Sequence, residues 1–240
     1  MQLDDDVYVL ALPMQVGGHT SSIHLSLVLD PGRDATLVDT GLPGQEEFLA
    51  AALAEAHLTV ADLTGIILTH QDIDHVGGLN ALVQASGATV YAGRTEVPYI
   101  DGTRPPRFAT PEMLAQRPEM RAVAERFRPT PVDVPLDDGM RLDLAGGVRA
   151  IFTPGHTPGH LCLYLERTRT LIAGDALTAS DGQLSGPNER ATADMAEAAR
   201  SVRKLAELEV ATIVCYHGGV VRDAAAEQLR RVAAALASLG

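Results

Sequence analysis

Stretches of alternating or continuous apolar residues predict short strands in the first part of the chain. Three such segments are VYVLALPM (7–14), SIHLSLVLD (22–30) and ATLVDTG (35–41). Their patterns are typical of strands. Helical spacing among alanine, leucine and glutamate predicts a helix over residues 45–58. A buried strand at 63–70, a short helix at 77–87 that ends in glycine, and a strand at 88–93 are expected next.

The second half of the chain repeats this order of strands followed by helices. Residues 140–177 predict four strands joined by tight turns. A helix at about 192–207, a strand at 211–219 and a helix at about 222–238 are expected after them. Strands in groups with helices at intervals predict an α/β protein whose sheets are covered by helices. We expect a single domain over residues 1–240, built from two similar halves.

Composition argues against several classes of function. The formal net charge of −12 predicts a surface that repels nucleic acid and anionic membranes. No apolar stretch has the length of a membrane span, and acids occupy the start where a secretory signal would carry positive charge. Two cysteines are too few for a disulfide framework. We expect a cytoplasmic monomer or homodimer that acts on a small-molecule substrate, with no nucleic-acid or membrane partner.

Side chains that can bind metals recur at the ends of the apolar strands, where a layered α/β protein exposes functional groups. The first cluster is HQDIDH, with His70, Asp72, Asp74 and His75. In an extended segment the first three would project to one side and His75 away from them, so one loop could serve two neighbouring ions. Closing both coordination spheres requires distant ligands. The natural suppliers are His156 in TPGHTPGH, Asp175 in LIAGDAL and His217 in IVCYHGG.

This order of motifs, from LVDTG through HQDIDH, GH and GD to HGG, resembles the metallo-β-lactamase superfamily, in particular its glyoxalase II and lactonase-like branch. The resemblance implies an αββα sandwich of two mixed β-sheets flanked by helices. It implies a dinuclear site with His70, Asp72 and His156 on one ion and Asp74, His75 and His217 on the other. Asp175 would bridge the two ions. Asp39 and His160 correspond to supporting positions that hold ligand geometry.

One residue departs from the family pattern, because most relatives carry histidine where this chain has Asp72. A carboxylate is a harder ligand than imidazole, which favours Fe²⁺ or Mn²⁺ more than an all-nitrogen site does. We expect two divalent ions, with Zn²⁺ first and Fe²⁺ or Mn²⁺ as alternatives.

The resemblance implies a hydrolase in which a metal-bound hydroxide attacks an ester, thioester or lactone carbonyl, with Asp74 as the catalytic residue that orients the nucleophile. Three alternatives stay open. The first is iron-dependent oxidation like that of a persulfide dioxygenase, and the second is phosphodiesterase or nuclease activity. The third is a binding protein that has lost its activity.

Residues 94–134 interrupt the alternation of strands and helices. They hold a Pro-Pro pair, seven arginines and one expected helix at about 111–127. This insert is either a solvated helical excursion or a lid over the metals whose arginines contact an anionic part of the substrate. We favour the lid.

Overall fold

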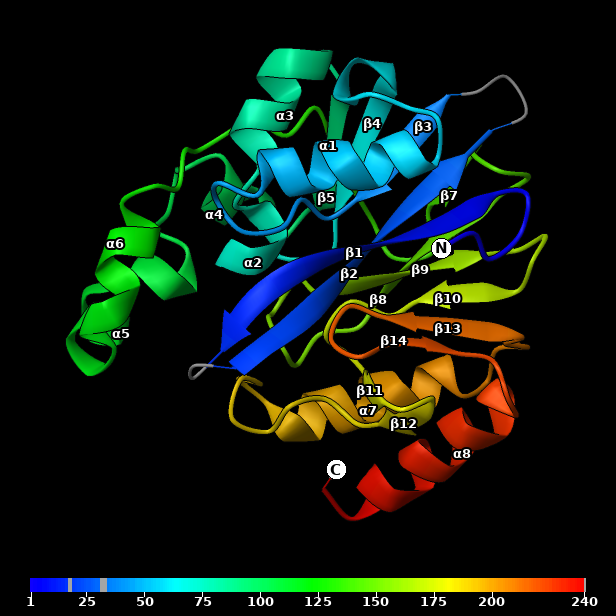
Figure 1. The fold of residues 1–240 in the computed structure, drawn as a ribbon. Helices are drawn as coiled ribbons and strands as arrows, with labels where there is room; N and C mark the ends of the chain where they lie inside the picture. The colour runs from blue at the N-terminus through cyan, green and yellow to red at the C-terminus, as the bar shows by residue number, and fades with distance from the viewer. Residues whose placement is uncertain (17–18, 31–33, 240) are drawn as a thin grey trace.

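Two six-stranded sheets stack face to face, and helices cover the outer face of each (Figure 1). The computed structural model describes residues 1–16, 19–30 and 34–239. The strands of the first sheet, in spatial order, are β1 (Val7–Val16), β2 (His19–Leu29), β3 (Ala35–Val38), β4 (Leu63–Leu68), β5 (Thr89–Gly93) and β6 (Val134–Leu136). Those of the second are β14 (Gly219–Val221), β13 (Thr212–Cys215), β10 (Thr170–Ile172), β9 (Leu161–Leu165), β8 (Val148–Phe152) and β7 (Arg141–Leu142).

Two pairs of longer helices cover the sheets. On the first sheet these are α1 (Glu46–Glu55) and α3 (Leu79–Ser86), and on the second α7 (Met195–Leu205) and α8 (Ala225–Ala235) (Figure 1). The shorter elements are η1 (Val60–Asp62), α2 (Ile73–Val76), α4 (Val97–Ile100), η2 (Arg107–Ala109), α5 (Pro111–Gln116), η3 (Pro118–Met120), α6 (Arg121–Ala124), the hairpin β11 (Thr178–Ser180) and β12 (Gln183–Ser185), and η4 (Leu236–Leu239).

Three apolar layers hold this sandwich together. Leu37 and Ile66 of the first sheet pack with Leu49 and Leu53 of α1. Residues of both sheets, such as Val38, Ile67, Leu163 and Ile172, form the layer between them. The third layer joins the second sheet to α7 and α8 through residues such as Leu171, Val202 and Leu229. The predicted α/β sandwich of two mixed sheets flanked by helices is therefore confirmed.

Parallel pairing directs several chain segments to one edge of the sandwich. Strands β3, β4, β5 and β6 pair in parallel, and so do β10 and β13. Parallel strands present their carboxyl ends at the same edge, which is where functional loops of α/β sheets gather. The segments that follow β3, β4, β10 and β13 carry Asp39, HQDIDH, Asp175 and His217.

Two local predictions are wrong. The helix expected at 111–127 is broken into α5, η3 and α6, because Pro118 lacks an N–H and restricts Arg117, which has φ −131° and ψ 73°. The HQDIDH loop is not extended throughout, because its second half turns into α2. There the N–H groups of His75 and Val76 both donate to the carbonyl of Asp72, at 2.8 and 2.9 Å.

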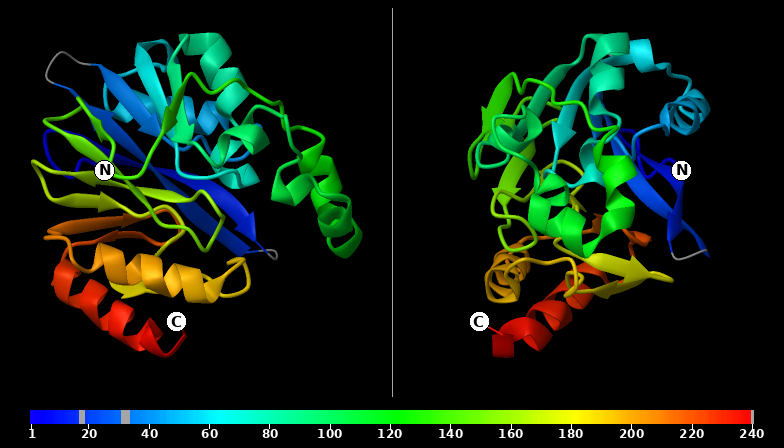
Figure 2. Two further views of the ribbon diagram at one scale, coloured as in Figure 1. Left: turned by 180° about the vertical axis from the view of Figure 1, so that it is seen from behind. Right: turned by 90° about the vertical axis from the view of Figure 1, so that its left-hand side faces the viewer.

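The insert contributes α4, η2, α5, η3 and α6, and its α5–α6 part projects from the sandwich (Figures 1 and 2). Its action as a lid stays a prediction, as does the single domain over residues 1–240, of which 17–18, 31–33 and 240 lie outside the described residues. Within the described ranges, no helix combines the length and the apolar character that crossing a bilayer requires.

Candidate metal centre

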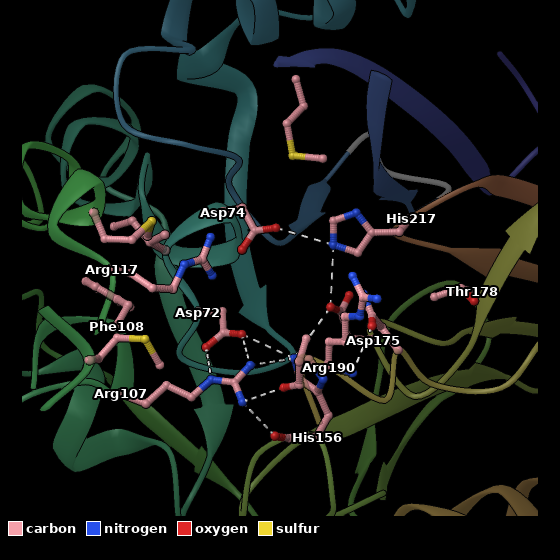
Figure 3. A pocket seen from close by; sticks show the side chains of 16 residues that line it. Asp72, Asp74, Arg107, Phe108, Arg117, His156, Asp175, Thr178, Arg190 and His217 are labelled. Carbon is pink, nitrogen blue, oxygen red and sulfur yellow. Dashed lines mark hydrogen bonds and ion pairs between the residues drawn. The ribbon is translucent and has the colours of Figure 1, made fainter. Parts of the chain in front are cut away.

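Four loops bring the seven predicted ligand residues together at one edge of the sandwich, and Figure 3 shows five of them, Asp72, Asp74, His156, Asp175 and His217. They are the segments after β4, between β8 and β9, after β10 and after β13. Gly174 permits one of these turns: it has φ +50°, and a Cβ there would lie 2.7 Å from Nε2 of His160. Without a side chain at this position, the backbone N–H of Asp175 donates to that same nitrogen, at 3.0 Å.

The ligand residues form two adjoining groups that share Asp175. In the first, Oδ2 of Asp72 lies 3.4 Å from Nε2 of His70 and 3.2 Å from Nε2 of His156. In the second, Nε2 of His217 lies 3.3 Å from Oδ2 of Asp74. Nε2 of His75 lies 3.9 Å from Oδ2 of Asp74.

Asp175 joins the groups. Its Oδ2 lies 3.5 Å from Nε2 of His156 and 3.4 Å from Nε2 of His217, and its Oδ1 lies 3.3 Å from Nε2 of His75. The structure thus brings all seven side chains together. Their assignment as metal ligands stays a prediction.

Asp39 supports histidines of both groups from behind. Nδ1–H of His75 donates to Oδ2 of Asp39 over 2.9 Å, so Nε2 of that ring faces the centre. The hydroxyl of Thr69 donates to the same carboxylate and lies 3.0 Å from Nδ1 of His70. A hydroxyl carries one proton, so Nδ1–H of His70 donates to Thr69 and the lone pair of its Nε2 is free to bind a ligand.

His160 does not face the centre as a ligand. Its Nε2 accepts the backbone N–H of Asp175, and its Nδ1 lies 2.8 Å from the hydroxyl of Thr153. Both ring nitrogens therefore hold the loops around Asp175, which is the supporting position expected from the resemblance.

Glu96 was missed by the sequence analysis, although its side chain is fully buried beside the centre. Its carboxylate accepts the N–H of Gln71 at 3.0 Å, the hydroxyl of Thr157 at 2.9 Å and the N–H of Gly159 at 2.7 Å. It thereby ties the HQDIDH loop to the loop that carries His156. Nothing in its local sequence marked it, since a glutamate at the start of a helical turn is ordinary.

Orphaned polar atoms indicate that the centre suits a cation. Among the described residues, Nε2 of His70, Nε2 of His75 and Oδ1 of Asp175 are buried and have no hydrogen-bond partner. Each such atom costs about 1–3 kcal/mol, so a protein rarely keeps three together without a ligand. Imidazole nitrogen and carboxylate oxygen are donors that Zn²⁺, Fe²⁺ and Mn²⁺ accept. The residues present therefore fit divalent metal ions.

The histidines of the two groups differ in charge. Burial opposes the protonation of His75, but Asp39, Asp175 and Asp74 outweigh it and hold its pKa well above the usual value. Burial also opposes the protonation of His217, yet Asp175 and Asp74 raise its pKa to about 10. Burial and the neighbouring His75 lower the pKa of His70 to about 4. The second group therefore carries protons where a cation would go, and His70 is neutral.

A cavity of about 450 Å³ opens over this centre (Figure 3). Its floor includes Asp72, Asp74, His156, Asp175 and His217. Apolar side chains come from β1 and the insert, and arginines come from the insert and from the loop after β12. The remaining lining residues are Met14, Ile73, Arg107, Phe108, Met113, Arg117, Met120, Thr178, Asn188, Arg190 and Ala191. Arg107 reaches the centre itself, a contact that the sequence analysis did not foresee.

Comparison with known proteins agrees with this geometry. The model of the metallo-beta-lactamase superfamily matches residues 20–217, which include most strands of both sheets and the edge that carries the candidate ligand residues. The chain belongs to the metallo-β-lactamase superfamily. The membership confirms the predicted family, and the narrower glyoxalase II and lactonase-like branch stays a prediction.

Relatives within this superfamily include probable metallo-hydrolases of Bacillus subtilis. YybB is 27% identical, with 88% of this chain and 85% of that protein covered, and YflN is 28% identical over 76% and 74%. An atrochrysone carboxyl ACP thioesterase of Aspergillus fumigatus is 25% identical over 82% of this chain and 38% of its own length. The crystal structure of a metallo-β-lactamase family protein of Thermus thermophilus has a TM-score of 0.75, with 29% identity over 99% of this chain and 80% of that one.

Proposed function

We propose that this protein is a metal-dependent hydrolase of an ester, thioester or lactone bond in a small amphipathic molecule. The observation that carries the proposal is the convergence of six possible ligand residues beneath a cavity that Asp74, His156, Asp175 and His217 line directly. They form two groups, His70 with His156 and Asp175, and Asp74 with His75 and His217, each with ligand atoms within 4.8 Å of one another. Divalent ions bound there would polarise a carbonyl oxygen and lower the pKa of the attacking water.

Side-chain nucleophiles do not offer a competing route. Among the described residues that line the cavity, none is a serine or a cysteine, and the hydroxyl of Thr178 donates to the carbonyl of Gly186 at 2.9 Å. Cys162 and Cys215 are buried, and burial raises the pKa of the Cys162 thiol to about 12. A thiol with so high a pKa is a poor nucleophile at neutral pH. Water is therefore the nucleophile that the chain must orient.

Asp74 is the residue best disposed to orient that water. Its side chain is 22% exposed at the cavity and lies next to His217. Burial favours the neutral acid, but His75 and His217 keep the pKa of Asp74 below its usual value, so the carboxylate stays ionised. An ionised carboxylate accepts a hydrogen bond from water and fixes the direction of attack.

The walls of the cavity support an amphipathic substrate. Met113, Met120 and Phe108 of the insert provide an apolar wall, and methionine adapts to acyl chains of varied shape. Arg117 and Arg190 line the same cavity and are suited to a carboxylate or phosphate of the substrate (Figure 3). The thioesterase name of the Aspergillus relative supports an acyl thioester as one candidate.

A substrate screen tests this function. Acyl thioesters, lactones and aryl esters, each with and without a terminal carboxylate, are offered to the Zn²⁺-, Mn²⁺- and Fe²⁺-loaded protein. We expect hydrolysis of at least one carbonyl class, its loss on chelation, and a lower KM for the anionic members. A phosphodiester and a glutathione persulfide with oxygen monitoring serve as comparison substrates. Turnover of either in the absence of any ester hydrolysis would falsify the proposal.

A further inference from the structure

Arg107 makes an unusually complete set of contacts inside the first group of ligand residues. A guanidinium has five N–H donors, and each of the five has an acceptor here. Nε and Nη2 donate to the two carboxylate oxygens of Asp72, and Nη2 also donates to Nε2 of His156 at 2.8 Å. Nη1 donates to the carbonyls of His156 and Ala191, both at 2.9 Å. The acceptors form a socket that matches the guanidinium group.

The segment that carries Arg107 is firmly held. Its own backbone N–H donates to the side-chain oxygen of Gln71 at 2.8 Å, within the HQDIDH loop. The next residue, Phe108, is 5% exposed and packs edge-on against Phe127, with ring centroids 5.4 Å apart. Because the backbone of this segment is already ordered, the Arg107 side chain loses little further conformational entropy when it binds its acceptors.

The contacts of Arg107 use the same atoms that a metal ion would need. Nε2 of His156 can offer its lone pair to a guanidinium N–H or to a metal, but not to both. Both oxygens of Asp72 are engaged by the fork of the guanidinium, and a cation bound beside it would meet like charge. Asp74, His75 and His217 make no such contact with Arg107 in the described structure.

We propose that Arg107 is a built-in competitor for the first metal position, so that the two positions load unequally. The ion held by Asp74, His75 and His217 binds tightly and first. The position near His70 and His156 fills only when the guanidinium leaves its socket. Asp72 then serves as the partner of Arg107, which gives a physical role to the carboxylate where the family usually has histidine. This inference concerns metal loading and does not depend on which bond is hydrolysed.

Calorimetric titration of metal-free protein with Zn²⁺, and separately with Mn²⁺, tests the proposal without any substrate. For the wild type we expect one tight event and a second that is at least about 100-fold weaker. Arg107→Met keeps much of the length and removes the charge and the donors. It should strengthen the second event about 100-fold and change the first less than about threefold. Arg117→Met is the matched control, a cavity arginine on the same insert, and should leave both events unchanged.

Further variants separate competition from damage to the fold. Arg107→Lys keeps a positive charge but cannot donate two parallel hydrogen bonds to Asp72. The affinity of its second binding event should therefore lie between those of the wild type and Arg107→Met. Adding Asp72→Asn to Arg107→Met should preserve the stronger second binding event. Asp72 serves as the partner of the arginine, whereas the ligand residues His70, His156 and Asp175 remain in the double variant. Two equally tight events in the wild type would overturn the proposal. So would a second event that neither Arg107→Met nor Arg107→Lys strengthens, with circular dichroism confirming that both variants are folded.

Discussion

The two halves of the metal centre use the same residue types in opposite electrostatic settings. His75 and His217 lie among Asp39, Asp74 and Asp175, and these carboxylates outweigh burial and raise the pKa values of both rings. His70 is fully buried but has no such cluster of carboxylates, and burial together with its neighbour His75 lowers its pKa. The carboxylate on its side, Asp72, is neutralised by Arg107.

This contrast is the reason that we expect the two halves to bind cations unequally, although their residue types are alike. In the half with His75 and His217, only protons balance the carboxylates, and metal ions readily replace protons. In the half with His70, the protein supplies its own cation through Arg107, whose charge is permanent. We therefore expect the negative field to direct an incoming divalent ion toward Asp74, His75 and His217.

The largest effect is expected where both halves meet. Asp175 contacts His75, His156 and His217, so Asp175→Asn removes a negative charge from both positions. Supporting residues change metal affinity by roughly 10–100-fold, and this variant should lose more than about 100-fold in the affinity of the tight ion. Competition with a fluorescent chelator measures the affinity. Asp181→Asn, at an exposed hairpin position, is the control, and equal affinities of the two variants would contradict a shared role for Asp175.

A smaller change should separate the halves. Asp39→Asn keeps the size of the side chain, and asparagine tolerates the positive φ of 64° at this position. The Asp39 carboxylate binds the ring of His75 directly and reaches His70 only through Thr69. Binding of the tight ion should therefore be weakened more than that of the second ion, by roughly 10–100-fold. Thr69→Val removes the hydroxyl next to His70 and should lower mainly the affinity for the second ion. If each variant lowered the affinity for both ions to the same degree, the two halves would not be separately supported.

The convergence of the candidate ligand residues could be predicted from the sequence because each lies in a short polar motif that follows an apolar strand. The contact between Arg107 and Asp72 could not, since it links a Pro-rich insert without periodicity to a loop 35 positions earlier. Glu96 was missed for a similar reason, because its partners are backbone groups that any residues could present.

Some missed elements did have local signals. Asp181-Gly182 sits at the turn of β11–β12 with φ 51° and 75°, and Asp-Gly is a strong hairpin signal. Pro118 likewise indicated the break in the predicted helix. The order of the strands in each sheet depends on long-range packing, and the sequence analysis did not predict it.

The smallest effect concerns Glu96, which supports the His70 and His156 half through backbone contacts instead of a ligand ring. Glu96→Gln leaves one of its three donors without an acceptor, which should cost about 1–2 kcal/mol in the free energy of unfolding of the metal-free protein. Burial raises the pKa of Glu96 in spite of its hydrogen bonds to Thr157, Gly159 and Gln71. As pH rises above 4.5, the unfolded chain ionises first while the folded protein keeps its proton, so the wild type loses stability until the raised pKa is passed.

The variant has no such titration at this position, so the stability difference between the two proteins should be largest near pH 4.5 and should shrink toward neutral pH. Urea unfolding of both proteins at several pH values between 4.5 and 7 measures this difference. A difference that stayed constant or grew with pH would show that the carboxylate is charged in the folded state throughout. The tight ion at Asp74, His75 and His217 should bind almost equally well in both proteins, because Glu96 contacts only the loops of the other half.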